Sequence, residues 1–178
     1  MIDEKRIKEA RNNIGGYIAE GLVKKERNRE AEEVYLKNSD ISLKTAEKLM
    51  KDDIKPYLWV IVCSYYSMFY IANAVLSKIR YKVGDKVAHK ITSDLLVAVV
   101  LDKMKKELID NYEDIKTDAL EIASIKAESL IENYDIERRK RSDIQYKSLD
   151  EIKEQKARIS LQRAREFVFE MRVFYENK

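Results

Sequence analysis

Hydrophobic residues recur at steps of three and four through most of the chain, which is the spacing of one face of an α-helix. The last segment shows it most clearly, at Ala164, Phe167, Val168, Met171, Phe174 and Tyr175, with charged residues between them. Upstream, Ser148 and Glu151 form a capping box, in which each side chain accepts a hydrogen bond from the backbone amide of the other. We therefore predict a helix that begins at Ser148.

Further helices follow from the same spacing. Residues 28–53 carry one apolar stripe, with a break expected near Ser39 and Asp40, and a helix is expected directly after Pro56. Beyond Gly84, two adjacent rows of apolar residues run to Leu108. A further helix, with an acidic outer face, is expected between residue 111 and the basic run at 138–141. The region through Gly21 contains three glycines, so we expect a short helix, a bend and an extension there.

Turn residues are scarce. The chain has four glycines and one proline, and none of them follows Gly84, whereas hairpins and parallel sheets depend on such residues. The fold class predicted is all-α, as an antiparallel four- to five-helix up-and-down bundle. A length of 178 residues suits a single core. We divide it into a short N-terminal helical extension, residues 1–25, and one bundle, residues 26–178.

Residues 57–77 contain no charged side chain, although charged residues make up 38% of the chain. The stretch is long enough to span a membrane. It also carries four serines and asparagines and four tyrosines, and the amphipathic helices around it have apolar stripes to bury, so a central helix of a soluble bundle is favoured. We expect Tyr65, Tyr66, Phe69 and Tyr70 to pack in this core or at a dimer interface. No apolar stretch follows the basic residues at the N-terminus, so a cytoplasmic protein without membrane contact is expected.

Charge is nearly balanced overall, with 35 basic and 32 acidic residues, but it is unevenly distributed. Residues 110–137 hold nine acidic and two basic side chains, and the next four residues, 138–141, are all basic. Such a run either forms an anion-binding surface or remains a solvated helix face.

Single copies of two residue types limit the chemistry. One cysteine, Cys63, excludes a disulfide within the chain and any multi-cysteine zinc site. One histidine, His89, excludes sites that need two imidazoles from one chain, including helical zinc and di-iron sites. We expect no metal and no other cofactor, and we expect His89 to cap a helix, to pack or to contact a partner.

Three motifs in this order resemble the HEPN (higher eukaryotes and prokaryotes nucleotide-binding) family, in particular its small stand-alone prokaryotic and archaeal members. They are "SYYSMFYIANAVL", then "GDKVAHK" with His89 near a helix start, then "RRKRSDIQY". The resemblance covers residues 28–175. It implies a dimeric bundle with a cleft lined by both chains, and in many members a metal-independent endoribonuclease, often a toxin paired with a nucleotidyltransferase-type antitoxin or part of a defence system.

The family's nuclease motif is an arginine followed after four to six residues by a histidine. In this chain the residue at that place after Arg141 is Tyr146, and no histidine follows His89. Tyrosine, with an ordinary pKa near 10, is a poor base at neutral pH. Arg138, Arg139 and Arg141 still suit phosphate, and Asp143 can orient an arginine or end a helix.

Three functions remain open from the sequence. The first is a dimeric HEPN-like module that binds RNA, a nucleotide or a partner protein around Arg138, Arg139, Arg141, Asp143 and Tyr146. The second is an endoribonuclease that uses Arg141 with Tyr146 or His89. The third is a purely structural dimeric interaction protein. The many lysines and glutamates also hint at a heat-adapted host.

Overall fold

The computed structural model describes the backbone of residues 2–132 and 144–178 and the side chains of residues 2–123 and 153–178. Its α-helices are α1 (Glu4–Ala19), α2 (Arg29–Leu49), α3 (Tyr57–Lys78), α4 (Ala88–Leu95), α5 (Lys106–Glu132) and α6 (Ile144–Glu176). A π-helical turn, η1 (Leu96–Val100), and a 3-10 turn, η2 (Leu101–Lys103), join α4 to α5. Two strands of two residues, β1 (Val23–Lys24) and β2 (Lys82–Val83), pair antiparallel.

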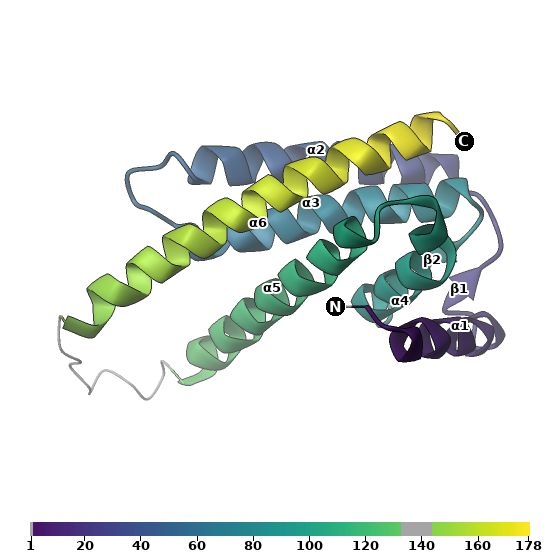
Figure 1. The fold of residues 1–178 in the computed structure, drawn as a ribbon, viewed down its shortest axis with the longest axis horizontal. Helices are drawn as coiled ribbons and strands as arrows, with labels where there is room; N and C mark the ends of the chain where they lie inside the picture. Colours follow the sequence, from purple (N-terminus) through teal and green to yellow (C-terminus); the bar gives the residue numbers. More distant parts are fainter. Residues whose placement is uncertain (1, 133–143) are drawn as a thin grey trace.

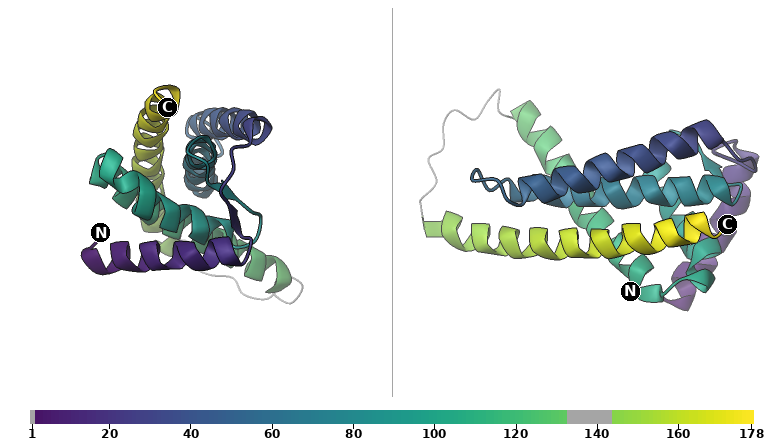
Figure 2. Two further views of the ribbon diagram at one scale, coloured as in Figure 1. Left: turned by 90° about the vertical axis from the view of Figure 1, so that its right-hand side faces the viewer. Right: turned by 90° about the horizontal axis from the view of Figure 1, so that it is seen from above.

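The predicted all-α bundle is confirmed. The long helices α2, α3, α5 and α6 run alternately in opposite directions, and α1 and α4 lie together at the end of the bundle that also holds the C-terminus (Figure 1). Seen from the end and from above, α2 and α6 both lie along α3, while α5 crosses at an angle (Figure 2). Tyr112 of α5 stacks on Phe167 of α6, with ring centroids 5.4 Å apart, and both side chains are fully buried.

Helix α3 is the central helix of the bundle. It is long and apolar enough to cross a membrane, but 72% of its most apolar window is buried inside the molecule. Pro56 directly precedes its first residue, and the Pro56 carbonyl accepts the first helical hydrogen bonds from Trp59 and Val60. Such burial is typical of the core helix of a soluble bundle. A position in the cytoplasm stays a prediction.

The predicted bend in the N-terminal region is wrong, because α1 continues through Gly15 and Gly16 to Ala19. Asp3 caps its start by accepting from the Arg6 amide at 2.7 Å. Hydrogen bonds from one face of α1 to the Asp94 carboxylate keep the helix continuous across its glycines. The chain leaves the helix at Gly21, whose positive φ of 71° suits glycine.

Two other predicted boundaries are also wrong. Helix α2 shows no break near Ser39, because the Ser39 hydroxyl turns inward and donates to the Ser67 carbonyl of α3 at 2.8 Å. Helix α6 is already formed at Ile144, so the capping-box sequence at Ser148 lies inside it. Residues 144–147 are themselves acceptable helix formers, and nothing in their sequence requires an interruption.

The two apolar rows predicted to run on to Leu108 are interrupted. After η1 and η2 the chain turns at Met104, which has extended backbone angles, and α5 starts at Lys106 rather than after residue 111. Leu96, Val100 and Leu101 are buried before this turn, and Leu108 and Ile109 are buried after it. The apolar pattern continues because both segments pack on the same core, although they belong to different helices.

Gly84 is the one glycine in close contact with another segment. Its amide donates to the Leu22 carbonyl at 2.9 Å, and a Cβ at this position would lie 3.2 Å from that oxygen. The absent side chain allows β1 and β2 to pair, with Val23 opposite Val83. This small sheet fixes the loop that leads into α4.

Candidate functional site

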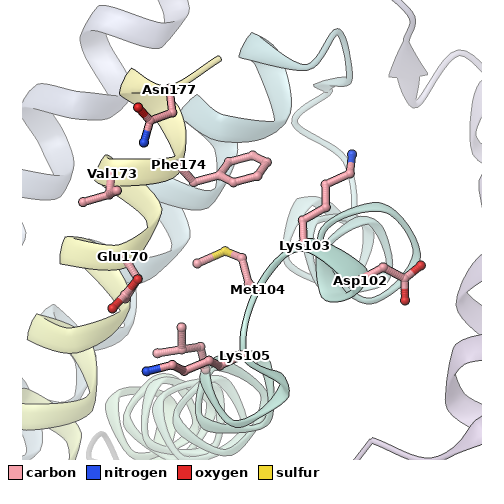
Figure 3. Close-up of a pocket in the computed structure, with 9 residues that line it drawn as sticks. Asp102, Lys103, Met104, Lys105, Glu170, Val173, Phe174 and Asn177 are labelled. Carbon is pink, nitrogen blue, oxygen red and sulfur yellow. The ribbon is translucent and has the colours of Figure 1, made fainter.

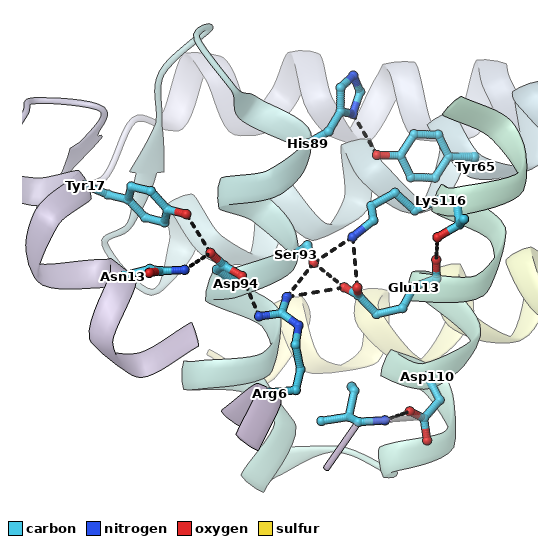
Figure 4. A network of polar contacts seen from close by, with 12 residues as sticks. Arg6, Asn13, Tyr17, Tyr65, His89, Ser93, Asp94, Asp110, Glu113 and Lys116 are labelled. Carbon is cyan, nitrogen blue, oxygen red and sulfur yellow. Dashed lines mark hydrogen bonds and ion pairs between the residues drawn. The ribbon is translucent and has the colours of Figure 1, made fainter. Parts of the chain in front are cut away.

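The only histidine lies against the central helix. His89, in the first turn of α4, is half-buried, and its Nδ1 atom lies 2.7 Å from the hydroxyl of Tyr65 on α3 (Figure 4). Tyr65 is fully buried. The histidine that the sequence placed near a helix start therefore makes a defined contact inside the molecule, to a residue 24 positions away.

Aromatic rings surround this contact. The His89 ring centroid lies 4.6 Å from that of Phe69, 5.5 Å from Tyr65 and 5.9 Å from Tyr66. Tyr66, Phe69 and His89 are all only partly buried, so the cluster reaches the surface. We call Tyr65, Tyr66, Phe69 and His89 the histidine cluster.

The electrostatic surroundings keep His89 neutral. Burial lowers the pKa of His89, and the positive charge of Lys116 on α5 lowers it further. Burial also raises the pKa of Tyr65 far above its ordinary value, so this hydroxyl stays protonated. At neutral pH a neutral imidazole thus meets a protonated phenol.

The hydrogen bond sets the position of the histidine proton. The buried Tyr112 hydroxyl lies beside that of Tyr65 and lowers the pKa of Tyr65, as a hydrogen-bond donor does. The Tyr65 proton is then left for the histidine, so we assign the Tyr65 hydroxyl as the donor and Nδ1 as the acceptor. A neutral ring whose Nδ1 accepts carries its own proton on Nε2, and this atom points away from Tyr65 in Figure 4. His89 is thereby prepared to donate a hydrogen bond to a ligand oxygen, and it is poorly prepared to accept a proton.

Helix α4 enters the site through an unusual turn. Val87, directly before its first residue, has left-handed backbone angles, with φ of 52°, although it is β-branched. This conformation costs an L-residue about 1–2 kcal/mol. The buried Ile91, Thr92 and Leu95 on the following turns anchor the helix, and this packing keeps His89 in place.

A polar network beneath the histidine cluster joins α1, α4 and α5 (Figure 4). Asp94 is only 1% exposed, and its carboxylate accepts from three residues of α1: Arg6 at 2.6 Å, Asn13 at 2.9 Å and Tyr17 at 2.6 Å. These three residues share one face of the helix. Asp94 therefore compensates for the low helix propensity of the glycines in α1.

Ser93 connects this network to α5. Its hydroxyl accepts from Arg6 and from Lys116, each at 2.9 Å, and donates to Glu113. Lys116 also pairs with Glu113 at 2.8 Å. The same lysine that lowers the pKa of His89 is thus held in position by the network.

Sequence reasoning missed this network. Arg6, Asp94 and Glu113 were not candidates, because their partners lie up to 88 positions away. One signal was present in the sequence: Asp94 interrupts an otherwise uncharged run from Ile91 to Val100 on a segment with a buried face. A charge in such a position requires a partner.

Most of the site predicted from the sequence lies outside the described residues. This holds for Arg138, Arg139, Arg141 and Asp143, and for the side chain of Tyr146 in the first turn of α6. Their roles, and any approach of His89 to Arg141, stay predictions. Of the predicted aromatic residues, Tyr65 belongs wholly to the core, whereas Tyr66, Phe69 and Tyr70 are partly exposed.

The partly exposed rings belong to a longer stripe on α3. Trp59, Val62, Cys63, Tyr66 and Tyr70 recur at steps of three and four residues, and none of them is fully buried. We call these five residues the α3 stripe. Phe69 and His89 lie at its edge, where Phe69 also contacts Tyr66 and Tyr70.

Within the described residues, no three His, Cys, Asp or Glu side chains lie close enough together to hold a metal ion. No protein-family model matches the chain, and no curated protein or solved structure matches it.

Proposed function

We propose that this chain is a homodimeric HEPN-like module that binds RNA or a nucleotide and does not cleave it. Arg138, Arg139 and Arg141 bind phosphate in this proposal, and the histidine cluster contributes stacking surface and a hydrogen-bond donor. The observation that carries it is the hydrogen bond from Tyr65 to Nδ1 of His89. This bond makes Nε2 a donor for ligand oxygens at the protein surface.

The surroundings of His89 support nucleic-acid binding. Bases stack on partly exposed aromatic rings beside cations, with about 1–3 kcal/mol per stacked base. Phe69 and Tyr66 are such rings, and the exposed Lys90 follows His89 directly on α4. Helix α3 alone could not provide such a platform, because residues 57–77 carry no charged side chain. Helices α4 and α5 supply the polar groups that α3 lacks.

A second copy of the chain would cover the α3 stripe. Trp59 is 49% exposed, and on α2 Val34 and Ile41 are 55% and 51% exposed. Val34 and Ile41 lie seven residues apart and so on one face of α2, and Tyr35 stacks on Tyr70 of the stripe with ring centroids 6.4 Å apart. Apolar surface of this kind on neighbouring helices is typical of an interface. The histidine cluster would then border the groove between two copies.

Salt-dependent binding tests the proposal. Fluorescence anisotropy with a labelled mixed-sequence RNA should show affinity that falls as salt rises, and an Arg141→Ala variant should lose about one unit of the slope of log Kd against log salt. A Phe69→Ala variant should bind more weakly with the slope unchanged, because stacking releases no counterions. Absent or salt-insensitive binding of RNA and of ATP would count against the proposal and leave a structural interaction protein.

A second candidate is a metal-independent endoribonuclease, which in a toxin–antitoxin pair would have a nucleotidyltransferase-type antitoxin as its partner. One observation favours it: His89 is uncharged at neutral pH and reaches the surface, and an uncharged imidazole acts as a general base in the tautomer that leaves Nε2 without a proton. Arg141 would stabilise the phosphate, with His89 or Tyr146 moving the proton. Cleavage of RNA without metal that disappears in a His89→Gln variant would establish this candidate.

A further inference from the structure

A surface pocket of about 550 Å³ lies between the start of α5 and the end of α6, away from the histidine cluster (Figure 3). Met104, Leu108, Val173 and Phe174 provide its apolar lining. The Met104 and Phe174 side chains both point into it. The pocket exists because the chain breaks at Met104, between the turn η2 and α5, and so leaves the last turns of α6 partly uncovered.

Exposed apolar side chains continue from the pocket along α6. Phe169 is 66% exposed, Ile159 42% and Val173 39%. At about 100° per residue, these three positions fall within a sector of about 80° on the helix. Phe169 lies one turn from Val173, which lines the pocket, so the apolar surface is continuous from the pocket to at least this ring.

The charged residues of the pocket are divided between its two walls. Lys103 and Lys105 line it, are exposed, and form no ion pair with a described residue. Asp102 is already paired with Arg11 at 3.1 Å, which leaves Glu170 as the carboxylate on the opposite wall. Lys178 lies over the Phe174 ring, 5.6 Å from its centroid. An incoming group with negative charge is therefore favoured on the side of Lys103 and Lys105.

We propose that this surface docks an acidic amphipathic helix of a partner protein. One bulky apolar side chain of that helix enters the pocket against Phe174 and Met104, and the next apolar residues pack on Val173 and Phe169. Carboxylates on the flank of the helix pair with Lys103 and Lys105. A helix laid into a groove in this way anchors through residues three and four positions apart. The surface shares no residue with the α3 stripe or with Val34 and Ile41 of α2, so its variants leave the residues of the proposed dimer interface unchanged.

Two matched peptides test the proposal on the full-length protein. Both are fluorescein-labelled and about four helical turns long. They carry leucine and phenylalanine on one face, and the remaining positions are glutamate in one peptide and lysine in the other. Anisotropy should show the acidic peptide binding at least about tenfold more tightly than the basic one. Replacing Lys103 and Lys105 by glutamate should remove the preference for the acidic peptide. The Phe169→Ser variant should bind the acidic peptide more weakly and still prefer it to the basic one.

The matched control replaces two exposed cations by glutamate: Lys48 in the last turn of α2 and Lys51 just after the helix. It changes the net charge by the same amount and should leave the preference intact. Unaltered thermal unfolding of each variant shows that the fold persists. Any of three results would overturn the proposal: the acidic peptide does not bind, both peptides bind equally well, or the two double variants change peptide binding to the same extent. Loss of labelled RNA binding in the Lys103/Lys105 variant, with peptide binding unchanged, would also overturn it and indicate a nucleic-acid surface.

Discussion

The Tyr65 hydroxyl donates to Nδ1 of His89 over 2.7 Å, and this contact determines how the only histidine of the chain can act. A buried tyrosine fixes the ring and its tautomer, while Lys116 and burial keep it uncharged. His89 is therefore held as a neutral donor at the edge of the α3 stripe. A general base would need a free nitrogen lone pair directed at the substrate.

Stability should depend on the protonation of His89. Its pKa is lowered in the folded state, so the unfolded chain binds a proton more readily near the ordinary value of about 6.5. The contribution of His89 to the free energy of unfolding is therefore fully present above the pKa of the unfolded chain. It is lost as the pH falls from that pKa towards the lower pKa of the folded state. Urea unfolding at pH 7.5 and at pH 5.5 should therefore differ less in a His89→Gln variant than in the native protein. An identical difference in both proteins would mean that His89 is not perturbed.

Truncation of two phenylalanines on α6 should affect stability to very different extents. Phe167 is fully buried and stacks on Tyr112, whereas Phe169 is 66% exposed. Phe167→Ala should lower the free energy of unfolding by about 3–5 kcal/mol through lost burial and a cavity. Phe169→Ala should change it by less than about 0.5 kcal/mol. Chemical denaturation of the two variants measures both, and similar losses would contradict the assigned orientation of α6.

The Asp94 carboxylate should anchor α1. In an Asp94→Asn variant, the partly buried Arg6 loses its closest carboxylate, at 2.6 Å, while Glu113 remains at 3.9 Å, and we expect the free energy of unfolding to fall by about 2 kcal/mol. Hydrogen exchange should rise in α1 before it rises in α3. The control is Asp102→Asn, because the Asp102–Arg11 pair is exposed and should contribute well under 1 kcal/mol. Equal protection of α1 in the native protein and the Asp94→Asn variant would show that other contacts hold this helix.

The apolar surface of α2 and α3 should mediate self-association. Light scattering coupled to gel filtration should give a dimer for the native chain and a monomer for Ile41→Glu, because a charge would be buried at the interface. Phe169→Glu places the same charge on α6, outside this surface, and should remain a dimer. If the native chain is a monomer, or if the Ile41→Glu variant is still a dimer, the proposed dimer interface is wrong.

Two of the long helices could be predicted because their apolar residues follow one period over many turns, as in α2 and in the second half of α6, whereas α3 was predicted from Pro56 and the uncharged stretch that follows it. A short N-terminal helix was predicted, but its continuation through Gly15 and Gly16 was not, since the low helix propensity of these glycines is outweighed by hydrogen bonds to Asp94 that link distant segments. The helix start predicted at Ser148 failed for a different reason. A capping box shows where a helix can begin, but it does not prevent the preceding residues from being helical.

The candidate site was only partly foreseen. The sequence placed His89 near a helix start and four aromatic residues on a central helix, and the structure brings His89 together with three of them, Tyr65, Tyr66 and Phe69. The sequence could not show that the Tyr65 hydroxyl binds Nδ1 of His89, because that contact depends on how α4 packs on α3. The strained turn at Val87 and the break at Met104, which determine the direction of α4 and open the pocket, have no local sequence signal such as glycine or proline.

The most direct test is to incubate metal-free protein with a mixed pool of labelled RNA and to follow retention and cleavage in the same samples. The native chain, Arg141→Ala and His89→Gln are compared. We predict intact RNA throughout, retained by the native chain and released more readily by Arg141→Ala. Cleavage that is lost in His89→Gln would contradict a binding role, and so would the absence of any retention by the native chain.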